Sequence, residues 1–210
     1  MNNITRLACW ISLGLLAMCP AGSAAETKVL FEDKFDTKIG DGWSWVREDS
    51  AAWRIKDKSL QIRVQPGVAD TVKSALVREA PDRSKGKFAI EVTITSLKKP
   101  VQQYEQAGIT WYRSGKPVFK LVKELVSGKV LIIPGAKPMT NDTVQLRLIV
   151  NGDSFTAQFR PDSKGEFQTA AEGNLPPSSG DQVSIQCYNG PAGEEHWIKF
   201  DDFRITELKE

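Results

Sequence analysis

The chain has 210 residues, with 28 Lys and Arg against 26 Asp and Glu and a formal net charge of +2 at pH 7. Because the basic residues are dispersed among acidic ones, the sequence shows no electrostatic footprint for a nucleic-acid partner. No internal repeat, low-complexity tract or long linker divides the chain, so its length favours one domain with a substantial core.

The N-terminus has the features of a secretory signal peptide. Arg6 precedes an apolar run from Leu7 to Cys19, and small residues at 21–25 favour cleavage before Glu26. The run is shorter than the ~20 apolar residues that a membrane-spanning helix needs. We therefore predict a signal peptide at 1–25, a mature domain at 26–210 without a membrane span, and a secreted or periplasmic location.

The cysteine content argues against a disulfide framework in the mature domain. Cys9 and Cys19 fall in the predicted signal peptide, which leaves Cys187 alone. Its alternation with apolar neighbours predicts a buried thiol that packs as a small hydrophobic group. A thiol nucleophile activated by His196 is the alternative.

Alternating apolar and polar residues predict β-strands along most of the chain. The runs 87–94, 144–150 and 155–159 each repeat with a period of two and are rich in β-branched and aromatic residues. Asn151-Gly152, between the last two runs, is a strong hairpin signal. Further turn residues delimit about a dozen short strands, with no convincing amphipathic helix. The pattern predicts an all-β fold, a two-sheet antiparallel β-sandwich.

Several spaced segments resemble the concanavalin A-like lectin/glucanase superfamily. They read YEQAGITWY at 104–112, VFKLVKE at 118–124, VQLRLIVNGDSFTAQF at 144–159 and WIKFDDFRI at 197–205. The chain is most similar to an uncharacterised group of sandwich domains marked by Q-A-G and by a Lys and a Glu four residues apart, and it also resembles the C-terminal sandwich domain of β-xylosidases. The resemblance implies a concanavalin A-like jelly roll in which saccharides lie across a concave sheet. The segment 134–138 reads PGAKP and departs from the polar-aromatic segment that the group carries at this place.

Strand alternation selects a set of outward side chains as a candidate saccharide site. If neighbouring apolar residues face the core, the side chains that face away from it include an aromatic ring, charged groups and an amide. Rings stack on the C–H faces of sugars, and charged groups and amides pair with hydroxyls. The predicted carbohydrate-binding residues are Tyr112, Lys120, Glu124, Arg147 and Gln158. The alternative is an ordinary solvated sheet face with cross-strand ion pairs.

Two other functions remain open on the sequence. A glycoside-active enzyme could use Glu124 with Glu91, if the two carboxylates face one cleft about 5 Å apart or somewhat further. The E-x-D-x-E string of the glucanase branch is absent from the chain. A structural or protein-interaction sandwich is the third alternative.

Acidic residues near both ends of the mature chain suggest a structural cation. Related sandwiches hold Ca²⁺ where the first and last strands meet, and such a pairing here brings Asp33 near Asp201 or Asp202. Carboxylates are the hard oxygen ligands that Ca²⁺ prefers. The alternative is that these acids cap turns and face water.

Overall fold

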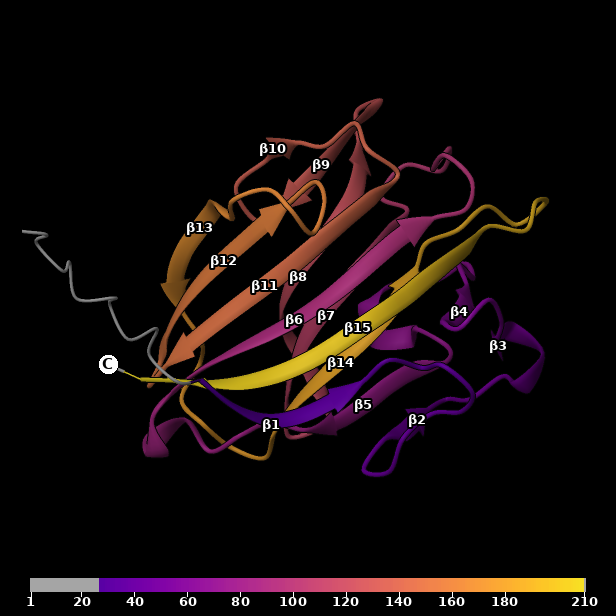
Figure 1. The fold of residues 1–210 in the computed structure, drawn as a ribbon. Helices are drawn as coiled ribbons and strands as arrows, with labels where there is room; N and C mark the ends of the chain where they lie inside the picture. Colours follow the sequence, from indigo (N-terminus) through magenta and orange to yellow (C-terminus); the bar gives the residue numbers. More distant parts are fainter. Residues whose placement is uncertain (1–26, 210) are drawn as a thin grey trace, which may run out of the picture.

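The computed structural model describes residues 27–209, which form two antiparallel β-sheets packed face to face (Figure 1). The predicted all-β, two-sheet sandwich is therefore confirmed. The predicted signal peptide at 1–25 lies outside the described residues. Among the described residues, no helix has the length and apolar character needed to cross a membrane.

One sheet, called sheet A here, lies in front in Figure 1 and contains both the first and the last strand. The last strand, β15, pairs with β6 on one side, and β4 and β1 pair with successive parts of its other side. The order of strands across sheet A is β13 (Gln168–Asn174), β12 (Ser154–Arg160), β11 (Thr143–Asn151), β6 (Lys87–Ser96), β15 (Trp197–Leu208), β4 (Leu60–Arg63) and β3 (Trp53–Ile55), with β1 (Lys28–Asp33) beside β15.

The second sheet, sheet B, lies behind the first in Figure 1. Its central strands, β7 and β14, pair along their whole length, and a bulge near Trp111 interrupts the pairing of β7 with β8. Within residues 27–209, three 3-10 helices lie in the connections: η1 (Ser50–Ala52), η2 (Ala69–Thr71) and η3 (Arg83–Lys85). The order of strands across sheet B is β10 (Lys137–Pro138), β9 (Lys129–Ile133), β8 (Lys116–Val126), β7 (Gln106–Arg113), β14 (Asp181–Tyr188), β5 (Ala75–Glu79) and β2 (Ser44–Val46).

The core fills the space between the sheets with the apolar members of each alternating run. Ile90 and Leu148 from sheet A and Trp111 from sheet B are fully buried there. Burying each such side chain contributes about 1.5–3 kcal/mol, which explains why period-two patterning determines the fold. Cys187 joins this core as predicted, and burial raises the pKa of its thiol.

A buried lysine side chain connects the two sheets at one end of the sandwich. Lys123 on β8 is 6% exposed, and its ammonium donates hydrogen bonds to the backbone oxygens of Asn141 (2.7 Å) and Asp142 (2.8 Å) and to Ser96 Oγ (3.3 Å). Desolvation lowers the pKa of Lys123 from 10.5 to about 8, although the charge of Asp142 acts in the opposite direction. The lysine therefore ties sheet B to the loop that leads into β11.

Lys123 should make stability rise with pH. Between about pH 8 and 10.5 the unfolded chain retains the Lys123 proton that the folded chain has released, so the unfolded state binds more protons and raising the pH favours folding. Relative to the Lys123→Met variant, the wild-type free energy of unfolding should increase by about 2 kcal/mol between pH 7 and 10. Urea denaturation across this range measures the difference. The difference between the wild type and the exposed-lysine variant Lys137→Met should not change with pH. A difference between the wild type and Lys123→Met that stayed constant from pH 7 to 10 would contradict the prediction.

Candidate functional site

Lys120 and Glu124, predicted from their spacing, meet on the outer face of sheet B. The Lys120 ammonium donates to Glu124 Oε2 (2.9 Å) and to Gln106 Oε1 (2.7 Å) on the neighbouring strand β7. Gln106 Nε2 in turn donates to Glu124 Oε1 (3.1 Å) and to the backbone oxygen of Tyr104 (2.8 Å). The Glu124 side chain is 6% exposed and that of Lys120 is 33% exposed. The three side chains form a closed network with its ammonium end toward solvent.

A second set of polar side chains lies beside this network on β7 and β14. Gln186 Oε1 accepts hydrogen bonds from the hydroxyls of Tyr112 (2.8 Å) and Ser184 (3.1 Å). Gln186 Nε2 and Thr110 Oγ1 are buried and have no hydrogen-bond partner within the described residues. Leaving a buried polar atom unpaired costs about 1–3 kcal/mol. The outer face of sheet B therefore has unused hydrogen-bonding capacity.

The segment 64–74 between β4 and β5 covers part of this face and accounts for its burial. Gln65 forms a parallel bridge with Tyr188 at the end of β14, and η2 lies beside β8. Between them, Val72 packs against Val77 and Tyr188 in a small apolar cluster outside the main core. Several side chains that point away from the core on this sheet, among them Thr110, Ser184 and Gln186, are consequently buried.

Three tyrosines border the polar side chains. Burial raises the pKa of the Tyr112 hydroxyl, and burial together with the nearby Glu124 raises that of Tyr188, so both remain protonated at neutral pH. Both hydroxyls are then poor bases, and the Tyr112 hydroxyl uses its proton in the hydrogen bond to Gln186 Oε1. Tyr104, two residues before β7 begins, is 52% exposed and presents its ring to solvent.

The sequence prediction omitted part of this group. Alternation along 183–188 gives the outward direction of Ser184, Gln186 and Tyr188, and the Q-A-G motif contains Gln106. What the pattern could not show is that segment 64–74 folds over them. Without that cover these side chains resemble an ordinary solvated strand face.

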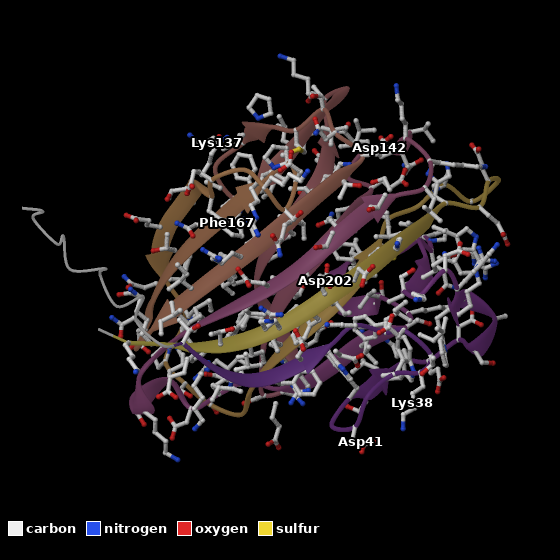
Figure 2. The ribbon with its side chains drawn as sticks, viewed as in Figure 1. Lys38, Asp41, Lys137, Asp142, Phe167 and Asp202 are labelled. Carbon is white, nitrogen blue, oxygen red and sulfur yellow. The ribbon has the colours of Figure 1, made fainter. Side chains whose placement is uncertain are left out.

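Arg147 and Gln158 lie elsewhere, and the prediction that all five residues share one face is wrong. They belong to β11 and β12 of sheet A, and both point to its outer face, opposite to that of sheet B. Arg147 Nε donates to Glu91 Oε1, and its guanidinium lies 3.5 Å from the centre of the Phe167 ring; Gln158 bonds Thr169 weakly, at 3.5 Å. Figure 2 labels Phe167 on the side of sheet A that faces the viewer. Alternation tells inward from outward but does not tell which sheet a strand joins.

A pocket of about 350 Å³ does lie beside Arg147 on sheet A. Glu91 and Arg204 also line it, and Arg204 is itself paired with Glu32. Each of the two guanidinium groups in this pocket already has a carboxylate partner. The pocket therefore attracts an anionic ligand less strongly than its two arginines alone would.

The carboxylate pair proposed for catalysis is not assembled. Glu124 points outward from sheet B and pairs with Lys120, whereas Glu91 points outward from sheet A and pairs with Arg147. The whole thickness of the sandwich separates the two groups, so the prediction that they face one cleft is wrong. A two-carboxylate hydrolysis that uses this pair is excluded by the topology.

Asp33 organises a loop instead of presenting a free carboxylate. Its Oδ1 accepts a hydrogen bond from the Phe35 N–H (2.9 Å). Its Oδ2 accepts from the Gly40 N–H (2.8 Å) and from the indole of Trp43 (3.0 Å). These bonds to its own following loop occupy both carboxylate oxygens, which is a common role for Asp at the end of a strand.

The predicted calcium pair is wrong for a geometric reason. Asp33 is opposite Phe203, whose side chain is in the core, while Asp201 is opposite Thr93 and points to the outer face of sheet A. Asp202, in the bulge that follows Asp201, is exposed and does not lie beside Asp33 either; Figure 2 labels it on the side of sheet A that faces the viewer. The described part of the chain contains no group of three or more His, Cys, Asp or Glu side chains able to hold a metal ion. These residues do not fit a Ca²⁺ site.

The strand order and the paired sheets define the concanavalin A-like sandwich fold, as the sequence resemblance implied. No protein-family model matches the sequence, and no curated protein matches it significantly.

Solved structures with the same fold include carbohydrate-active enzymes. The GH43 protein BlXynB of Bacillus licheniformis matches with a TM-score of 0.66 and 19% identity, over 84% of this chain and 39% of its own. A xylan β-1,4-xylosidase of Bacillus halodurans matches with a TM-score of 0.64 and 14% identity, over 84% and 39%. An alginate lyase of Corynebacterium sp. matches with a TM-score of 0.52 and 13% identity, over 76% and 82%. The chain thus spans about two fifths of the length of each of the two Bacillus proteins, and at these identities the likeness shows the fold.

Proposed function

We propose that this chain is an exported saccharide-binding domain whose ligand lies on the outer face of sheet B, beside Lys120, Glu124 and Gln106. The observation that carries the proposal is the buried polar cluster on a face that points away from the core. Two of its atoms, Gln186 Nε2 and Thr110 Oγ1, have no partner within the described residues. Buried polar groups are normally paired, so these atoms favour a polar ligand or ordered water at this face.

The chemistry of the cluster suits a sugar. Lys120 has a third N–H beyond the two that it already uses, and the Gln186 amide has an unpaired N–H group. Together with the oxygens of Glu124 as acceptors, they give the mixture of donors and acceptors that adjacent hydroxyls require. The exposed ring of Tyr104 offers a flat apolar surface for the C–H face of a pyranose. The names of the matched structures, a xylosidase and an alginate lyase, support a saccharide ligand, and the predicted signal peptide supports export.

Binding is favoured over hydrolysis by the charges at this face. Glu124 is the acidic side chain of the network, and Lys120 and Gln106 occupy both of its oxygens. A hydrolase of the two-carboxylate type needs a second acid within roughly 5–10 Å. Glu91, the predicted partner, lies on the other sheet.

Affinity electrophoresis against a glycan panel that includes xylan and alginate tests the proposal. The wild-type chain should be retained by at least one glycan. Lys120→Met and Tyr104→Ala should weaken that retention about tenfold or more, equivalent to about 1.4 kcal/mol of binding free energy. Tyr104 is exposed, so its variant should keep the wild-type melting temperature.

Arg147→Ala is the matched control because Arg147 lies on the opposite outer face. It should be retained like the wild type. Loss of retention in Arg147→Ala alone would place the saccharide on sheet A, and absence of retention on every glycan would overturn the proposal.

A further inference from the structure

A separate pocket of about 500 Å³ opens at the end of the sandwich near Lys123. It lies between strands β8, β9 and β10 of sheet B and the connections that precede β7 and β11. None of the residues of the Lys120 network lines it. Its volume is within the 300–1,000 Å³ range typical of small-molecule sites.

The lining of this pocket is mainly apolar. Leu125 and Met139 are buried beneath it, and the backbone N–H of Met139 bonds the Val130 carbonyl, which fixes β10 against β9. No aromatic ring is present in the lining, so the pocket lacks the stacking surface that a sugar prefers. The apolar residues of the lining are Pro100, Leu125, Val130, Leu131, Pro138 and Met139.

Its charged residues are predominantly basic. Three lysines, Lys99, Lys123 and Lys129, line the pocket against one acid, Asp142. Lys99 and Lys129 are exposed and form no ion pair with any other residue between 27 and 209. Two cationic side chains are thus free to contact a ligand at the mouth of an apolar cavity.

Lys123 contributes a fixed positive charge below that mouth. Its three ammonium protons are directed at the carbonyl oxygens of Asn141 and Asp142 and at Ser96 Oγ, so it holds the wall formed by residues 140–142 in place. Burial lowers the pKa of Lys123 to about 8, and a neighbouring anion would favour its charged form.

We propose that this pocket binds a medium-chain carboxylate. The hydrocarbon body lies against Leu125, Leu131 and Met139, where its transfer from water is favourable. The carboxylate lies at the mouth between Lys99 and Lys129, and the buried charge of Lys123 adds to the attraction. A neutral sugar lacks the negative charge, and an organic cation is repelled by three lysines.

Isothermal titration with octanoate, acetate and octylammonium tests both parts of the proposal. Octanoate should bind, and acetate, which lacks the apolar body, should bind at least tenfold more weakly. Octylammonium has the same body with the opposite charge and should also bind at least tenfold more weakly. Equal affinity for octanoate and octylammonium would overturn the proposed role of the lysines.

Variants locate the site. The double variant Lys99→Glu/Lys129→Glu should weaken octanoate binding at least tenfold, and both positions are exposed, so folding should be unaffected. The double variant Lys116→Glu/Lys164→Glu alters the net charge equally at exposed positions outside the pocket and should bind like the wild type. If both double variants lost octanoate affinity equally, the effect would come from net charge alone, and the proposed site would be wrong. Lys120→Met should bind octanoate normally, which separates this result from that of the saccharide experiment.

Discussion

Replacing Gly108 by alanine should lower the free energy of unfolding by about 3 kcal/mol or more, because the backbone of β7 approaches β8 too closely for a side chain. A Cβ atom at position 108 would lie 2.3 Å from the backbone oxygen of Leu121 and 2.9 Å from the Cα of Val122. The φ angle of Gly108 is also +154°, which L-residues rarely adopt. Neither the neighbouring backbone nor the φ angle can adjust without disrupting the central strands of sheet B.

Gly86 provides a control that separates the two causes. Its φ angle is +140°, close to that of Gly108, but a Cβ atom there would meet nothing within 4 Å. Gly86→Ala should therefore show only the backbone strain, about 1 kcal/mol. Urea denaturation followed by circular dichroism measures both variants. Equal destabilisation of the two would show that the contact with β8 is not tight.

This geometry divides the Q-A-G motif into separate roles. Gly108 is required where β7 passes against β8, Ala107 is in the core, and Gln106 connects Lys120 with Glu124. Residues of the motif thus contact β8 directly and determine how β7 and β8 pack. The residues that its resemblance singled out, Lys120 and Glu124, do come together as their spacing predicted.

The strands could be predicted because apolar residues in the sequence mark the positions that are buried, and these positions repeat with a period of two. The runs around Ile90, Leu148 and Phe159 alternate in the sequence and face the core in the structure. The allocation of strands to sheets could not be predicted in the same way. The chain crosses from sheet B to sheet A between β10 and β11, and no local pattern marks that crossing.

That limit explains the errors at the site. Alternation predicts that Arg147 and Glu91 share the face of Lys120 because both point outward, and outward is the correct direction for their own sheet. The resemblance implies a cation at Asp33, where the first and last strands meet, but the carboxylate bonds its own following loop. For Arg147 and Glu91 the missing information was the pairing of strands distant in the sequence, which decides the sheet that each strand joins.

Arg83 makes a buried contact of this long-range kind, and its loss should be among the most destabilising changes in the chain. The side chain is 2% exposed and is held by Asp181 (2.8 Å), Asp153 (3.0 Å) and the backbone oxygen of Pro176 (2.8 Å). These partners come from the turn between β11 and β12, from the connection between β13 and β14, and from the first residue of β14. The first of these is the turn at Asn151-Gly152 that the sequence predicted. Removing one member of a buried ion pair costs about 3–5 kcal/mol, because the remaining charge has no partner. Arg83→Met should therefore lower the free energy of unfolding by that amount, as measured by urea denaturation.

Two further variants test whether the stability lost in Arg83→Met comes from the carboxylate that is left without a partner. Asp181 is 7% exposed, so adding Asp181→Asn to Arg83→Met removes the uncompensated carboxylate and should recover part of the lost stability. Arg63→Met breaks a more exposed ion pair with Glu195 and should cost no more than about 1 kcal/mol. If the double variant were less stable than Arg83→Met alone, the buried carboxylate would not be the source of the penalty. The stabilisation would then lie in the packing of the Arg83 side chain near the ring of Trp111, where its guanidinium carbon is 5.7 Å from the ring centre.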